Sequence, residues 1–160
     1  MREDLFDELS PELEALAEAL FDVSVVFVRK SGGFLPHGAV LEADGGVQRI
    51  AACSGDPDAI TTPAAELPFL HQSLRDVARD PGIVAIAVCE DVTITLEGEK
   101  PTPAVKVLVE HRRALSVAYC LPWRKKWFGR IALGGVITMD AAPEVRPWDG
   151  PTSQSADPNT

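Results

Sequence analysis

Apolar residues recur at helical spacing through the first thirty positions of the chain. They follow steps of three, four and seven residues, which place them on one stripe of an α-helix. Ser10 followed by Pro11 predicts the start of this helix, because serine caps the first turn and proline suits the first helical position. The stripe consists of Leu5, Leu9, Leu13, Leu16, Leu20 and Phe27.

Residues 23–30 are open to two interpretations. The β-branched run that begins at Val23 favours a strand, because branching at Cβ restricts the side chain in a helix. Arg29-Lys30 followed by Gly32-Gly33 is typical of a helix C-terminus, where cations and glycine are stabilising. We favour a helix that continues to about Lys30.

A β-hairpin is predicted next. The apolar runs 34–43 and 47–53 flank Asp44-Gly45-Gly46, and an Asp-Gly turn between such runs is typical of a hairpin.

Helical spacing then returns over about 64–79. This second helix begins at Thr62-Pro63 or at Glu66-Leu67-Pro68, and Asp80-Pro81-Gly82 ends it.

The rest of the chain favours strands, over residues 83–96, 104–111, 115–121 and 130–139. Large apolar residues alternate with small or polar ones through the first of them, which is the period of a strand. The middle two are expected to form a hairpin in which Val109 faces Val117, so that the bulky side chains share one face.

The elements therefore follow the order α-β-β-α-β-β-β-β, which predicts an α+β fold. Hairpin-linked strands are antiparallel, so we expect a two-layer sandwich of about six mostly antiparallel strands, with both helices on one face. We place a single globular domain at residues 1–139. Prolines among Ser, Thr, Asn and Asp predict a disordered or loosely docked tail at 140–160, with Trp148 as its one apolar anchor.

Charge and composition exclude several classes of protein. The net charge of −9 disfavours nucleic acid and anionic membranes as partners. Acidic residues at the N-terminus disfavour a secretory signal, and no apolar run approaches the ~20 residues of a spanning helix. We expect a cytoplasmic protein, in which Cys53, Cys89 and Cys120 are small buried hydrophobes rather than disulfide or zinc partners.

Short motifs resemble those of a small family of uncharacterised bacterial proteins. They are Phe34-Leu35-Pro36-His37-Gly38-Ala39-Val40-Leu41, then Ala43-Asp44-Gly45, and Val109-Glu110-His111-Arg112. The resemblance covers about residues 10–140. The family has no assigned activity, so the resemblance implies no catalytic residue.

Three residues are candidates for a ligand-binding or acid–base site. Glu90 lies in the large-residue series of its strand, so strict alternation directs it into the core, where burial raises a carboxyl pKa. The alternative is a β-bulge at Glu90-Asp91 that turns both carboxylates to water. His37 and His111 lie on other predicted strands, and they could join Glu90 if these strands are neighbours in the sheet. For His111, which lies near a hairpin loop, the alternative is a half-exposed structural histidine, and Pro36 beside His37 indicates a sheet edge or a bulge.

No motif for catalysis, cofactor binding or metal binding is present. The chain has no GxSxG, P-loop, GxGxxG or HExxH pattern, and no cysteine has a neighbouring cation that would lower its pKa. We therefore predict no catalytic residue, no cofactor and no metal.

Charge is strongly segregated along the chain. Residues 1–22 hold eight acids and one arginine, whereas Trp123 and Trp127 bracket the basic run Arg124-Lys125-Lys126. Arg112-Arg113 lies at the other end of the intervening strand, roughly 23 Å away and beyond two Debye lengths, so the cations form two clusters rather than one nucleic-acid surface. An acidic helix, from the same chain or from a second copy, is the better partner for either cluster.

Two functions follow as hypotheses. The first is a non-enzymatic protein-interaction domain that forms a homodimer, with Trp123, Arg124, Lys125, Lys126 and Trp127 as its exposed contact residues. The alternative is a small enzyme or ligand-binding module with a pocket near Glu90, His37 and His111.

Overall fold

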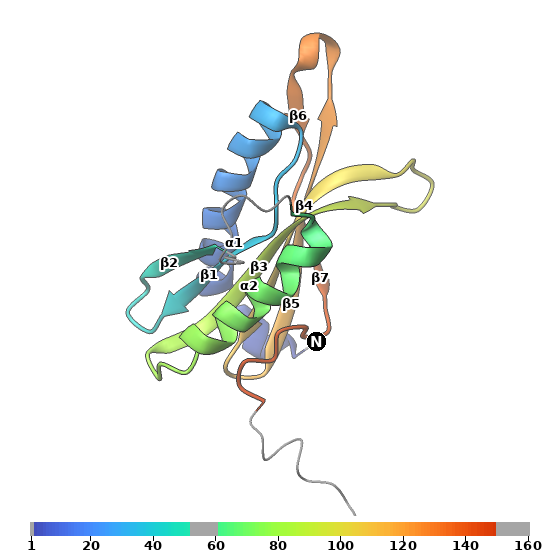
Figure 1. The fold of residues 1–160 in the computed structure, drawn as a ribbon. Coiled ribbons are helices and arrows are strands. Elements are labelled where there is room, and N and C mark those ends of the chain that lie inside the picture. Colours follow the sequence, from blue (N-terminus) through green and yellow to red (C-terminus); the bar gives the residue numbers. More distant parts are fainter. Residues whose placement is uncertain (1, 52–60, 150–160) are drawn as a thin grey trace, which may run out of the picture.

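A computed structural model of the protein describes residues 2–51 and 61–149, and it confirms the α+β class. Two helices and an antiparallel curled sheet follow the predicted order, except that the last predicted strand is split in two (Figure 1). The helices are α1 (Glu3–Ser31) and α2 (Pro63–Val77). The strands are β1 (His37–Glu42), β2 (Val47–Ala51), β3 (Ile83–Ile94), β4 (Thr102–His111), β5 (Leu115–Lys125), β6 (Ile131–Leu133) and β7 (Ile137–Asp140).

Helix α1 is longer than expected at its N-terminus. The predicted start at Ser10-Pro11 is wrong, because the helix begins at Glu3 and continues through Pro11. Pro11 is exposed, so the helical hydrogen bond that proline cannot make is lost on the solvent side, where it costs less. Ser10 does not cap the helix; its hydroxyl donates to the Glu14 carboxylate at 3.0 Å.

The C-terminal half of α1 settles the question left open at residues 23–30. They are helical, and Gly32 ends the helix in the left-handed conformation with its N–H donating to the Val28 carbonyl. The buried stripe continues through Ser24 and Val28, whereas Phe27 is 45% exposed. The prediction that Phe27 belongs to the stripe is therefore wrong. The stripe passes through Ser24 instead, whose small polar side chain does not indicate a buried position.

The strands form a sheet in the order β2-β1-β3-β4-β5, and β6 and β7 both pair with the far edge of β5. The predicted β4–β5 hairpin is confirmed in its register, with Val109 opposite Val117 and Val107 opposite Tyr119. Gly134-Gly135 separates β6 from β7, which is why one predicted strand becomes two.

The two helices lie on opposite faces of the sheet, so the expectation that both cover one face is wrong (Figure 1). Helix α1 packs on the face that contains Ala85, Ala87 and Cys89, and α2 packs on the face that contains Ile86 and Val88. Ala85, Ala87 and Cys89 are fully buried under α1. Their small side chains let the helix approach the sheet closely. Alternation of large with small residues marked two buried faces rather than one buried and one solvated face.

Part of the segment predicted as tail packs on the α2 side of the sheet. Residue Val145 is buried beside Leu70 and Leu74 of α2, and Trp148 lies partly buried against the same cluster. Residues 150–160 lie outside the described part of the chain, as does Cys53. Cys89 and Cys120 are buried free thiols, as predicted.

No helix within residues 2–51 and 61–149 is long and apolar enough to cross a membrane.

Candidate functional site

His37 is half-buried and belongs to a hydrogen-bonded group with the fully buried Ser24 and Cys89, beneath the C-terminal half of α1. The Ser24 hydroxyl lies 2.8 Å from His37 Nε2 and 3.1 Å from Cys89 Sγ, and β1 pairs His37 with Cys89. Burial, aided by the charge of Arg49, lowers the pKa of His37 to about 4, and burial raises the pKa of Cys89 to about 12. A thiol that stays protonated is a poor nucleophile, so this group ties α1 to β1 and β3 rather than supplying catalysis.

His111 lies at the other end of the α1 side of the sheet. Its Nδ1 accepts a hydrogen bond from the Arg113 backbone N–H at 3.0 Å, and its Nε2 lies 3.6 Å from a Glu12 carboxylate oxygen. Burial lowers the pKa of His111, and the Glu12 charge opposes that effect. The histidine therefore links the β4–β5 turn to α1.

Glu90 points to the opposite face. The strand continues through it in regular register with Lys106, so no bulge forms at Glu90-Asp91. Glu90 is half-buried, and its pKa is raised by burial and by the charge of Glu144, against the lowering effect of Lys106. Because successive strand residues point to opposite faces, Glu90 is separated by the sheet from His37 and His111.

The structure thus does not bring the three candidate ligands into one site. In the parts of the chain that the structure describes, no group of three or more His, Cys, Asp or Glu side chains is arranged to hold a metal ion.

Glu110, which sequence analysis did not single out, holds the C-terminal segment against the sheet. Its carboxylate is buried and accepts three successive backbone N–H groups, from Glu144, Val145 and Arg146, at 3.1, 2.9 and 2.8 Å. The available signal was an acid directly after the apolar run Val107-Leu108-Val109, on the face opposite Val109. Nothing in the sequence indicated which backbone groups would donate hydrogen bonds to it.

We expect Glu110→Gln to lower the free energy of unfolding by about 2 kcal/mol, because the amide presents one acceptor oxygen where the carboxylate presents two. Glu144→Gln is the matched control, since Glu144 is exposed and its ion pair with Lys106, at 3.8 Å, contributes little. Urea unfolding of both variants measures the difference. Equal losses for the two would show that Glu110 does not anchor the segment.

The basic cluster of the predicted interaction surface lies on a projecting hairpin. Strand β5 pairs with β6 from Trp123–Leu133 to Lys125–Ile131, and a 3₁₀ turn over Trp127–Gly129 closes the end that projects beyond the sheet (Figure 1). We define the hairpin tip as Arg124, Lys125, Lys126, Trp127, Phe128 and Arg130.

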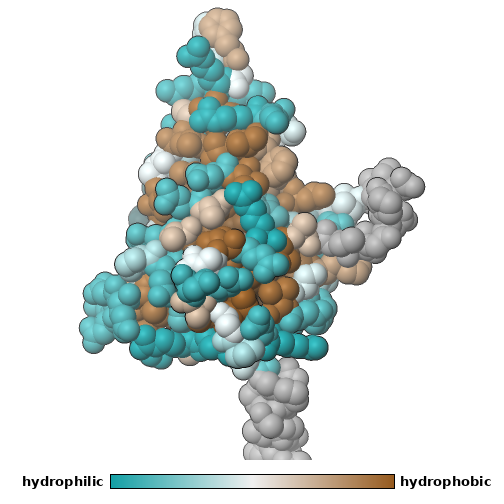
Figure 2. All heavy atoms as spheres, turned by 90° about the vertical axis from the view of Figure 1, so that its left-hand side faces the viewer, coloured by the Kyte–Doolittle hydropathy of each residue, from teal (hydrophilic) through white to brown (hydrophobic). Residues whose placement is uncertain are grey.

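Two aromatic side chains at the hairpin tip are exposed to solvent. Trp127 is 84% exposed and Phe128 is 94% exposed, and their rings meet edge-to-face at 5.8 Å. Phe128 also has a left-handed backbone conformation, with φ of 62°, which is unfavourable for a bulky residue. In the space-filling view the tip forms the narrow end of the molecule (Figure 2).

Trp123 is a correction to the predicted contact residues. It was expected to be exposed with Trp127, but it is 8% exposed and belongs to the core under α1. Alternation along β5 turns Trp123 inward, whereas Trp127 lies in the turn beyond the strand. Trp123 also borders an open hollow of about 700 Å³ between the hairpin and the loop that joins β3 to β4.

No family model, no curated protein and no solved structure matches this chain.

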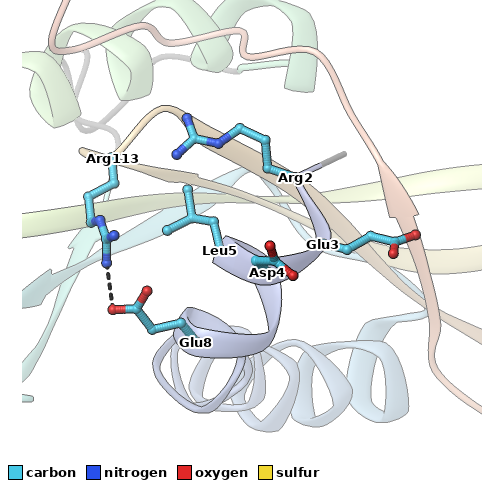
Figure 3. Close-up of a pocket in the computed structure, with 6 residues that line it drawn as sticks. All are labelled: Arg2, Glu3, Asp4, Leu5, Glu8 and Arg113. Carbon is cyan, nitrogen blue, oxygen red and sulfur yellow. Dashed lines mark hydrogen bonds and ion pairs between the residues drawn. The ribbon is translucent and has the colours of Figure 1, made fainter.

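The other basic cluster is already partnered within the chain. Arg113 donates to the Glu8 carboxylate of α1 at 2.8 Å, and the two side chains point toward one another beside an open hollow of about 620 Å³ (Figure 3). Arg112 donates to the backbone carbonyls of Ala78 and Asp80, just beyond the end of α2, and of Ile83, the first residue of β3. The acidic helix of the same chain therefore satisfies part of the charge complementarity.

The cations of the hairpin tip differ from that cluster. Arg124, Lys125, Lys126 and Arg130 are exposed, and within the described residues their side chains make no hydrogen bond or ion pair. No acidic residue occurs between Arg112 and Met139. The tip is thus a compact positive surface with two exposed aromatic rings, on a chain that is acidic elsewhere.

Proposed function

We propose that this protein is a protein-interaction domain that self-associates, and that the hairpin tip is its contact surface. The observation that carries the proposal is the exposure of Trp127 and Phe128 at the end of a projecting hairpin. Exposed tryptophan beside arginine is typical of the residues that dominate binding energy at protein interfaces. A bulky residue in a left-handed turn is strained, and such strain concentrates at functional positions.

The chemistry of the tip favours an acidic partner with an apolar patch. Four cations surround two aromatic rings, so a complementary surface presents carboxylates around apolar side chains. Nucleic acid and anionic membranes fit less well, because the rest of the chain has a strong negative charge that repels polyanions.

Helix α1 of a second copy offers such a surface. Glu14, Glu18 and Asp22 are exposed and follow one another at intervals of four residues, which aligns them along one line of the helix. The same line continues to Val26, which is 48% exposed, and Phe27 beside it is 45% exposed. We call Glu14, Glu18 and Asp22 the acidic ridge.

The acidic ridge and Val26 lie on one line of the helix and span roughly 18 Å, at 1.5 Å per residue. In this arrangement the aromatic rings lie on Val26 and Phe27, and the cations face the acidic ridge. Each copy contributes one hairpin tip and one helix, so a reciprocal two-fold dimer satisfies both.

The double variant Trp127→Ser with Phe128→Ser tests the proposal. We expect wild-type protein to be dimeric at micromolar concentration, and the variant to raise the dissociation constant by at least about 30-fold, since contact aromatics contribute about 2 kcal/mol or more. Sedimentation equilibrium measures the mass at several salt concentrations, and salt is expected to weaken the wild-type dimer.

Phe69→Ser is the matched control, because Phe69 is an aromatic residue of α2 that is 47% exposed and lies far from the tip in the sequence. It is expected to leave the dimer intact. A wild-type protein that stays monomeric to high micromolar concentration, or a dimer that survives loss of both tip aromatics, would contradict the proposal.

A further inference from the structure

The α2 side of the sheet contains a groove that is filled by the chain's own C-terminal segment. We call residues 143–148 the strap. Val145 of the strap is 1% exposed and inserts its side chain between α2 and the sheet, beside Leu70, Leu74 and Val88. The strap adds no strand to the sheet, since β7 ends at Asp140.

The groove recognises the backbone of the strap on both sides of Val145. The Glu110 carboxylate accepts its N–H and those of its two neighbours, and the Arg75 guanidinium donates to its carbonyl at 2.9 Å. An acid and an arginine on different elements thus hold one short peptide between them. This is a mode of binding that also serves for segments of other chains, because main-chain bonds give affinity while pockets give selectivity.

Side chains supply the selectivity. The pocket for Val145 is apolar, and the Arg112 guanidinium lies over the Trp148 ring with 5.2 Å to its centroid. Arg146 between them has a left-handed backbone, with φ of 53°, and its N–H donates to Glu110. The groove therefore takes a segment with an aliphatic residue, a left-handed turn and then an aromatic residue.

We propose that this groove is a peptide-binding site that accepts the strap of a second copy when its own strap is released. We choose this occupant because the strap is the segment that makes all of these contacts with the groove in the structure. Ala141 and Ala142, which join β7 to the strap, make no hydrogen bond within the described residues, so little holds the connection in place. The inference extends the proposed self-association to a second surface that does not involve the hairpin tip.

The strap of a second copy can bind only when the chain's own strap has left the groove. In the intact chain the tethered strap competes at an effective concentration of about millimolar, so exchange is suppressed at micromolar protein. A chain that has lost its own strap and a chain that has lost its groove are expected to combine with each other.

Mixing two full-length variants tests this. Arg146→Pro removes the N–H that reaches Glu110 and forbids the left-handed turn, so it spoils the strap and leaves the groove intact. Glu110→Gln weakens the groove and leaves the strap intact. Both also contain Trp127→Ser and Phe128→Ser, so that a failure of the hairpin proposal does not affect the result.

Each variant alone is expected to sediment as a monomer, and the equimolar mixture as a heterodimer of doubled mass. Arg146→Gly is the matched control, because glycine keeps the N–H, suits the left-handed turn and loses the same ion pair with Asp149. With its own strap still docked, the Arg146→Gly chain is expected not to combine with the Glu110→Gln chain.

A mixture that stays monomeric would overturn the proposal, and so would one in which Arg146→Gly combines as well as Arg146→Pro. Circular dichroism first establishes that each variant is folded. Val145→Ser replaces Arg146→Pro if the latter does not fold, since it removes the apolar anchor of the strap and retains every backbone group. The same two outcomes then decide the result.

Discussion

Replacing Leu16 by alanine is expected to lower the free energy of unfolding by about 3–4 kcal/mol, whereas Phe27→Ala is expected to cost less than about 1 kcal/mol. Leu16 is fully buried in the cluster that joins α1 to the curled sheet, and Phe27 is 45% exposed on the same helix. The larger side chain therefore contributes less, because almost half of its surface stays in water in the folded monomer.

Denaturant unfolding of the two variants at a concentration below self-association measures this contrast. The comparison also distinguishes the structure from the stripe predicted by the sequence, in which Leu16 and Phe27 would both face the core. Similar losses for Leu16→Ala and Phe27→Ala would mean that the stripe continues through Phe27 and that the C-terminal half of α1 is rotated from its position here.

The sequence predicts elements well where one periodicity dominates. Val109 opposite Val117 follows from alternation in two strands joined by a short turn, and Gly32 ends α1 where glycine and the preceding cations indicate. Both features depend on residues close together in the chain, for which local preferences and the fold agree.

The sequence predicts much less about which helix covers which face. Ala85, Ala87 and Cys89 are small, so they resemble a solvated face, yet they are the residues on which α1 packs. Serine at position 24 likewise interrupts the stripe of α1, although it is fully buried by its contacts with His37 and Cys89. Small residues are ambiguous because the partner that covers them is distant in sequence.

The candidate surfaces show the same division. The cations and Trp127 of the hairpin tip are visible in the sequence, because they are consecutive and no acid interrupts them. Beyond a docked Trp148, the contacts of the strap were not predicted, since Glu110 and Val145 are 35 residues apart and their hydrogen bond uses a backbone N–H, which every residue except proline has. Whether Glu90 and His37 lie in one site depends on the face of the sheet to which each side chain points, and alternation alone did not decide this.

Acidification is expected to destabilise the protein through His37, by up to about 3 kcal/mol between pH 6.5 and pH 4. The folded protein holds the pKa of His37 at about 4, because burial beneath α1 and the charge of Arg49 disfavour the imidazolium, while an unfolded histidine titrates near 6.5. Between these values the unfolded chain binds more protons than the folded chain, so stability rises with pH across the window and is lost as pH falls. The figure is an upper bound, because His37 is only half-buried and solvent screens part of the effect.

The difference between wild type and His37→Gln isolates this contribution. Glutamine retains a polar group for Ser24 and does not titrate, so the stability advantage of wild type over the variant is expected to be largest near pH 7 and to shrink toward pH 4. Burial lowers the pKa values of His71 and His111 as well, but both proteins contain those residues, and their contributions cancel in the difference. Urea unfolding at a series of pH values measures it. Parallel stability curves for the two proteins would mean that His37 is accessible to protons in the folded state, and that Ser24, His37 and Cys89 do not form the closed group that fixes α1 to the sheet.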